Sequence, residues 1–149
     1  MPSIVAHRGA SQDAPENTLA AFRLAWEQGA DAIEGDFRST RDGQVVCIHD
    51  ADLRRIGGIA RLVAESTLSQ LQEVDAGVWK GAKWKGERIP TFEDVLDILP
   101  DGKRLFLEIK SGPELLSPIR AILKTRRQRP ESMVIISFHP RVIEAAKRI

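Results

Sequence analysis

Short apolar segments that alternate with amphipathic segments constrain the fold of this chain most strongly. Strands are predicted where apolar and β-branched residues cluster, at 3–6, 31–37, 105–109 and 133–137. Helices are predicted from their periodicity at 19–28, 91–99, 115–123 and 142–149. Thr18 and Gly29 give the first helix a capping residue and a stop signal. This alternation favours βαβ units with a parallel sheet, so the predicted fold class is α/β.

Composition and charge exclude several classes of protein. Lys and Arg number 22 against 21 Asp and Glu in 149 residues, a balance that argues against a nucleic-acid binder. The single cysteine, Cys47, excludes an intramolecular disulfide framework and a cysteine-based zinc site. No apolar run approaches the roughly 20 residues of a transmembrane segment. The first residues lack the pattern of a secretory signal, so we expect a cytoplasmic location.

One connection, between Phe37 and Pro90, is far longer than the usual βα loop of about 2–6 residues. Asp42-Gly43 lies between two strand-like arms and predicts a hairpin. The remainder, at about 51–89, contains Gly57-Gly58 and a predicted helical turn at 69–73. Because long loops at the ends of parallel strands commonly carry function, we expect this long connection to be functional.

Acidic residues lie near the ends of two predicted strands. Alternation places Glu34 and Asp36 on one face of their strand, and it places Glu108 with Lys110 on one face of another. Separately, each pair is explained by a solvated strand end or a cross-strand ion pair. If the two strands are parallel neighbours, however, the three carboxylates converge and form a site for Mg²⁺ or Ca²⁺.

Two histidines leave strands at the same predicted edge. His7 ends the first strand beside Arg8, and His49 ends the hairpin arm beside Asp50. Imidazole is suited to acid/base chemistry near neutral pH, and the Arg8 guanidinium matches phosphate oxygens. The third histidine, His139, is expected to cap a helix or to be simply exposed. A hard metal ion, two imidazoles and the cations Arg8 and Lys110 together indicate phosphodiester cleavage.

At these positions the chain resembles the glycerophosphodiester phosphodiesterase family. The matching segments, in order and spacing, are His7-Arg8-Gly9-Ala10, Pro15-Glu16-Asn17-Thr18, Glu34-Gly35-Asp36, Thr40-Arg41-Asp42-Gly43, His49-Asp50, Ile89-Pro90-Thr91 and Glu108-Ile109-Lys110. The resemblance implies a TIM-type (β/α) barrel of the phospholipase C-like phosphodiesterase architecture. It also implies metal-dependent hydrolysis of glycerophosphodiesters to glycerol 3-phosphate and an alcohol.

The resemblance assigns a role to each matched residue. His7 and His49 match the acid/base pair, and Arg8 and Lys110 match phosphate contacts. The expected metal ligands are Glu34, Asp36 and Glu108. Glu16 and Asn17 match a supporting loop, and Asp50 would orient its neighbouring histidine or loop. The stretch at about 51–89 resembles the family's inserted segment that covers the site, and Trp79 in this inserted segment would line the alcohol pocket.

The length departs from that family. A complete barrel has eight strands and typically about 250 residues, whereas we count about four βα units here. We therefore expect residues 1–149 to form a partial barrel domain, to be completed by a C-terminal half-barrel or by a homo-oligomer. A small phosphodiester is the expected partner. Related lysophospholipase D or sphingomyelinase D-like activity, or a non-catalytic half-barrel interaction module, are the alternatives.

Overall fold

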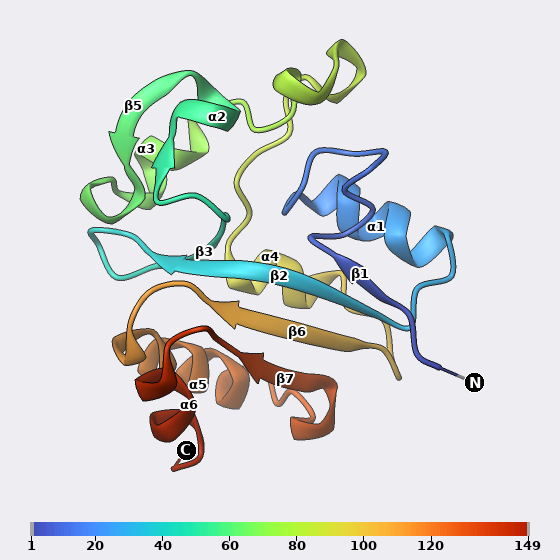
Figure 1. Ribbon diagram of the computed structural model, residues 1–149, viewed down its shortest axis with the longest axis vertical. Coiled ribbons are helices and arrows are strands. Elements are labelled where there is room, and N and C mark those ends of the chain that lie inside the picture. The colour runs from blue at the N-terminus through green and yellow to red at the C-terminus, as the bar shows by residue number, and fades with distance from the viewer. Residues whose placement is uncertain (1, 149) are drawn as a thin grey trace.

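A five-stranded sheet forms the centre of the computed structural model, which describes residues 2–148 (Figure 1). Four strands are parallel and lie in the order β1 (Val5–His7), β2 (Ala32–Ser39), β6 (Arg104–Ile109) and β7 (Met133–Ile136). β3 (Val45–Cys47) runs antiparallel to the end of β2, which confirms the predicted hairpin. The four strands predicted outside the hairpin are all present, with ends within two residues of the expected ones.

The order of the parallel strands follows their order in the sequence. In a doubly wound sheet the chain returns to the first strand and adds later strands on its other side. In a (β/α) barrel each new strand is added beside the previous one. The observed order is therefore that of a barrel rather than of a doubly wound sheet. Within residues 2–148 the sheet stays open, with β1 and β7 as its edges.

Helices follow the parallel strands as predicted. These are α1 (Leu19–Glu27), α4 (Phe92–Asp97), α5 (Leu116–Thr125) after the short η4 (Pro113–Leu115), and α6 (Pro140–Ala146) after β7. The Thr18 hydroxyl accepts the Ala21 N–H and caps α1, and Thr91 with Asp94 forms a capping box on α4. In the described part of the chain, no helix has both the length and the apolar character needed to cross a bilayer.

The main core lies on one face of the sheet and is shared by all four of these helices. Alternation along β2 sends Ile33 and Phe37 to this face, and Phe37 meets Phe92 of α4 edge to face at 5.3 Å between ring centroids. Other members of the same buried cluster are Phe22, Ala25, Val95, Leu105, Leu107, Ile109, Leu116, Ile119 and Val142. Because this face takes the apolar residues, Glu34, Asp36 and Glu108 are left on the opposite face.

The inserted segment has a small core of its own. It contains the ribbon β4 (Asp52–Leu53) and β5 (Ile59–Leu62), the helices α2 (Arg54–Gly57) and α3 (Leu68–Gln72), and the 3₁₀ turns η1 (Val63–Glu65), η2 (Val78–Lys80) and η3 (Ala82–Trp84). A last turn, η5 (Pro130–Ser132), precedes β7. The helical turn predicted at 69–73 is confirmed by α3, but the ribbon and α2 were not predicted. Their few residues carry no clear period, and all of β5 is exposed.

β3 joins the two cores. Val45 and Cys47 belong to the main core, whereas Val46 and Ile48 belong to the core of the inserted segment. Adjacent residues of a strand point to opposite sides, so a single strand serves both. The inserted segment, drawn in green in Figure 1, is therefore packed against the same hairpin that leads to His49.

The turn after β1 depends on close approach to α1. Arg8 and Gly9 both have positive φ, 57° and 78°, and a Cβ built on Gly9 would lie 2.7 Å from the Ala21 carbonyl carbon. We predict that Gly9→Ala lowers the free energy of unfolding by about 2–4 kcal/mol, from backbone strain and overpacking together. Urea unfolding of the purified chain measures this loss.

Gly29→Ala is the matched control for this prediction. Gly29 also has positive φ, 85°, but a Cβ there would meet nothing within 4 Å. Only the strain remains, so the expected loss is about 1 kcal/mol. Equal losses in the two variants would contradict the importance of the contact with α1.

Candidate active site

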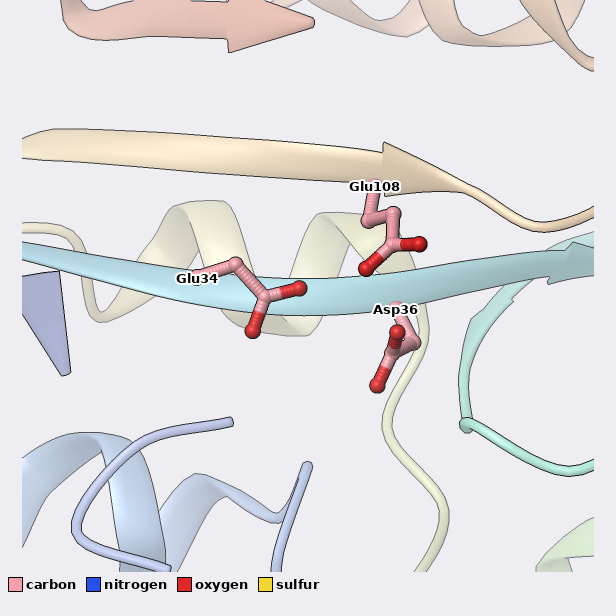
Figure 2. A group of neighbouring side chains, drawn as sticks. All are labelled: Glu34, Asp36 and Glu108. Carbon is pink, nitrogen blue, oxygen red and sulfur yellow. The ribbon is translucent and has the colours of Figure 1, made fainter. Parts of the chain in front are cut away.

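Three carboxylates meet on the face of the sheet opposite the main core. β2 and β6 are parallel neighbours with Asp36 opposite Glu108, so the predicted convergence is confirmed. Figure 2 shows Glu34 and Asp36 reaching from β2 and Glu108 from β6 toward a common point. Each offers one oxygen, and these oxygens all lie within 4.8 Å of one another. All three residues are buried, with Asp36 at 0% exposure.

Two cations lie against the carboxylates. The Arg8 Nε lies 3.1 Å from Asp36 Oδ2, and its backbone N–H donates to Glu34 Oε2 at 2.9 Å. The Lys110 ammonium lies 2.9 Å from Glu108 Oε1 and 3.5 Å from Asp36 Oδ1. With every group ionised, three negative and two positive groups leave a net charge of −1.

The buried negative charge is only partly compensated. Burial, followed by the charge of Asp36, raises the pKa of Glu34 from 4.5 to about 7. Among the described residues, two buried oxygens, Glu34 Oε1 and Asp36 Oδ1, have no hydrogen-bond partner. Such an oxygen costs about 1–3 kcal/mol when it stays unsatisfied. A divalent cation with a preference for oxygen ligands fits this set, because it would satisfy both atoms and offset the excess charge.

Asn17 holds Asp36 in place from the loop before α1. Its Nδ2 donates to Asp36 Oδ2 at 2.8 Å, and its Oδ1 accepts the Asp36 N–H at 3.1 Å. Asn17 adopts a left-handed conformation with φ 58°, which asparagine tolerates better than most residues. The Cys47 thiol also donates to Asn17 Oδ1, and burial raises its pKa well above the ordinary value. Cys47 is therefore a neutral packing group at the rear of the site.

The first two histidines lie at the same edge of the sheet but in different surroundings. His7 ends β1, with its Nε2 3.9 Å from Glu34 Oε2 and its side chain 67% exposed. The His49 ring is half-buried, and its Nδ1 lies 2.7 Å from Asp50 Oδ1. His49 is also held through its backbone, because the Arg38 guanidinium donates to its carbonyl oxygen at 2.9 and 2.7 Å.

The Asp50 contact selects one tautomer of the neutral His49 ring. A hydrogen bond from Arg55, together with one from His49, lowers the pKa of Asp50 to about 2. Asp50 is therefore a carboxylate at neutral pH and can only accept hydrogen bonds. The proton of the neutral ring must then sit on Nδ1, which leaves Nε2 as the basic nitrogen.

Sequence reasoning missed two arginines of this region. Arg38 follows Asp36 by two residues on β2, so alternation along the strand was a signal that predicts the same face. Arg55 of α2 gave no comparable signal, because only the packing of the inserted segment brings it to Asp50 and Glu16. His139 is exposed, as expected, and it occupies the N-cap position of α6, where its side chain makes no capping hydrogen bond.

The raised pKa of Glu34 predicts a pH-dependent stability. A folded-state pKa of about 7 against an ordinary 4.5 means that stability is lost as pH rises between these values. In the presence of a chelator, we expect Glu34→Gln to stabilise the chain at pH 8 by about 1–3 kcal/mol and to change little at pH 4.5. Urea unfolding at both pH values measures the difference.

Glu27→Gln is the control, since Glu27 is exposed on α1. It should leave the pH dependence of unfolding as in the unmodified chain. The prediction fails if Glu34→Gln and Glu27→Gln show the same pH dependence.

Comparisons with known proteins agree with this geometry. Residues 7–148 match the Glycerophosphoryl diester phosphodiesterase family. The chain is 42% identical over 137 residues to a glycerophosphodiester phosphodiesterase of Caldanaerobacter subterraneus subsp. tengcongensis, covering 90% of this chain and 56% of the relative. A glycerophosphodiester phosphodiesterase of Bacillus subtilis is 36% identical, over 90% of this chain and 51% of the relative.

Solved structures give the same result. An Oleispira antarctica phosphodiesterase in complex with the product sn-glycerol-3-phosphate matches with a TM-score of 0.92 and 33% identity, over 100% of this chain and 62% of that one. The glycerophosphodiester phosphodiesterase of Agrobacterium tumefaciens matches with a TM-score of 0.90 and 32% identity, over 100% and 63%.

The chain spans about half the length of the curated relatives that it matches. The family match nevertheless covers nearly all of its residues and every candidate site residue. The chain therefore belongs to the glycerophosphoryl diester phosphodiesterase family.

Proposed function

We propose that this chain carries the site of a metal-dependent enzyme that hydrolyses glycerophosphodiesters to glycerol 3-phosphate and an alcohol. The observation that carries the proposal is the cluster of three buried carboxylates with two unsatisfied oxygens, flanked by Arg8 and Lys110. Family membership supports it, as does the product bound by the Oleispira antarctica relative.

Charge balance supports a substrate with a single negative charge. A divalent cation bound by Glu34, Asp36 and Glu108 would change the net charge of the cluster from −1 to +1. A phosphodiester carries one negative charge and would bring the complex to neutrality. The Arg8 guanidinium and the Lys110 ammonium supply donors for its non-bridging oxygens.

We assign proton transfer to His7 and His49. One imidazole accepts a proton from water as the water oxygen bonds to phosphorus, and the other donates a proton to the departing alcohol oxygen as the phosphorus–oxygen bond breaks. His49 has Nε2 available for this task, because its Nδ1 is engaged by Asp50. When bound, Mg²⁺ or Ca²⁺ supplies Lewis-acid stabilisation of negative charge on the phosphoryl oxygens.

Residues 1–149 are proposed to form the metal-binding and acid/base part of a TIM-type barrel. The sequential strand order and the share of the relatives' length that the chain spans support this proposal. The open edges at β1 and β7 would be covered by a C-terminal half-barrel or by a second copy. A cytoplasmic location remains a prediction from the sequence.

The histidine assignment is tested on a protein that contains this chain in its complete form. We expect His7→Ala and His49→Ala each to lower kcat for glycerophosphocholine by about 10²–10⁴-fold, the range of general acid/base catalysis. Release of sn-glycerol 3-phosphate measures turnover. His139→Ala, a change at the exposed histidine, should alter kcat less than twofold.

Three results would contradict the proposed function. Unchanged turnover in His7→Ala or His49→Ala would remove the two-histidine scheme. A cyclic phosphate as the final product, or a requirement for long acyl chains, would indicate the lyase or lysophospholipase alternative instead of the hydrolase.

Metal binding is tested without turnover. Because a cation that binds only the folded chain stabilises it, saturating Mg²⁺ or Ca²⁺ should raise stability by about 2–3 kcal/mol at a hundred times its Kd. Thermal unfolding after chelation and metal addition measures the effect. We expect Asp36→Asn and Glu108→Gln to abolish it, while the exposed Glu65→Gln retains it. Equal stabilisation in all variants would contradict the site.

A further inference from the structure

One side chain of the inserted segment reaches both sides of the site. The Arg55 Nε lies 2.7 Å from Asp50 Oδ2, while its Nη2 and Nη1 donate to Glu16 Oε1 and Oε2 at 2.7 and 3.0 Å. Glu16 precedes α1 and is 39 residues from Arg55, whereas Asp50 follows the hairpin only five residues before Arg55. The Arg55 guanidinium therefore joins the loop before α1 to the end of the hairpin. The fork on Glu16 is bidentate, which is the strongest form of such a pair.

Each of these two carboxylates also contacts a candidate site residue. Asp50 uses one oxygen for Arg55 and the other for the His49 ring. Glu16 accepts from Arg55 and also from Arg8 Nη1 at 3.1 Å. Arg55 is therefore linked through Asp50 to His49, a candidate proton carrier, and through Glu16 to Arg8, a candidate phosphate contact.

Arg55 is itself held by the core of the inserted segment. Its neighbour Ile56 and the nearby Leu53 are buried in that core. The Arg55 guanidinium lies 5.7 Å from the centroid of the Trp79 ring, within the range of a cation–π contact. The Arg55 guanidinium is therefore supported by buried neighbours and by the Trp79 ring, although the Arg55 side chain is 41% exposed.

We propose that Arg55 is a positioning residue, which orients His49 through Asp50 and Arg8 through Glu16. By fixing Asp50, Arg55 keeps the proton of the neutral His49 ring on Nδ1 and directs Nε2 to the substrate. The effect on turnover rests on the proposed function, whereas the effect on the ring does not. A purely structural tie between the insert and the barrel would alter stability but not the tautomer of His49.

The tautomer is measured by nitrogen NMR of the histidine rings in the ¹⁵N-labelled chain. We expect Nδ1–H alone in the unmodified chain, and both tautomers at His49 in Arg55→Met, because Asp50 is then free to turn away from the ring. Arg54→Met is the matched control, since Arg54 is 73% exposed and pairs only with Asp52 among the described residues. It should leave the His49 signals unchanged.

Two further variants keep the proposal testable if Arg55→Met is poorly folded. Arg55→Lys retains the charge but cannot engage Asp50 and both Glu16 oxygens, so we expect a smaller shift toward the second tautomer. Glu16→Gln leaves the contact between Arg55 and Asp50, so we expect Nδ1–H to persist at His49. Unchanged His49 signals in folded Arg55→Met, or in folded Arg55→Lys, would overturn the proposal.

Turnover of the complete protein tests the consequence. We expect Arg55→Met to lower kcat for glycerophosphocholine by about tenfold or more, because a misoriented histidine loses part of the rate gain of acid/base catalysis. The kcat of Arg55→Lys should lie between those of Arg55→Met and the unmodified enzyme. If the unmodified enzyme is active and Arg55→Met matches Arg54→Met within twofold, the positioning role is wrong. If the unmodified enzyme releases no glycerol 3-phosphate, the proposed function fails, and a tautomer shift in Arg55→Met would still support the contact.

Discussion

Repulsion among three buried carboxylates is the constraint on which the rest of this structure depends. Glu34, Asp36 and Glu108 lie too close together to be ionised without compensation, and the pKa of Glu34 is raised first by burial and then by the charge of Asp36. Arg8 and Lys110 offset part of the charge. The remaining negative charge suits a divalent cation, and the proposal of a monoanionic substrate follows from the charge after such a cation has bound. The same arrangement that destabilises the metal-free chain is therefore the source of its proposed chemistry.

The fold places the three carboxylates on one face of the sheet and the stabilising apolar core on the other. Alternation along β2 and β6 sends apolar residues into the main core and carboxylates to the opposite face, so a single pair of strands serves both. β3 repeats the principle, because its two sides pack against the main core and against the core of the inserted segment. Through β3 and Arg55, the inserted segment is connected to the residues around His49 rather than merely placed above them.

Much of this was predictable, because the signals are local. A period of two along Glu34 and Asp36, and along Glu108 and Lys110, predicts one common face, and the parallel pairing then brings both pairs together. The boundaries of the main strands were also predictable within two residues. The small ribbon of the inserted segment was not, because four exposed residues of β5 carry no hydrophobic pattern. Its shape depends on the packing of Leu53, Leu71 and Val74 against Ile48 of the hairpin.

The sequence by itself determined the α/β class, the common face of Glu34 and Asp36, the two histidines at strand ends and the family. Each of these follows from residue type, from strand period or from motifs in a fixed order. The convergence of the three carboxylates also required the parallel pairing of β2 with β6, which the tertiary structure supplies. Only the tertiary structure decided which nitrogen of His49 is free, which oxygens of the cluster lack partners, and that Arg55 links Glu16 to Asp50. The link from Arg55 to Glu16 and the oxygens without partners depend on distances between atoms of segments far apart in the chain. The free nitrogen of His49 depends on how its neighbour Asp50 is oriented, and no pattern of residue types encodes these distances.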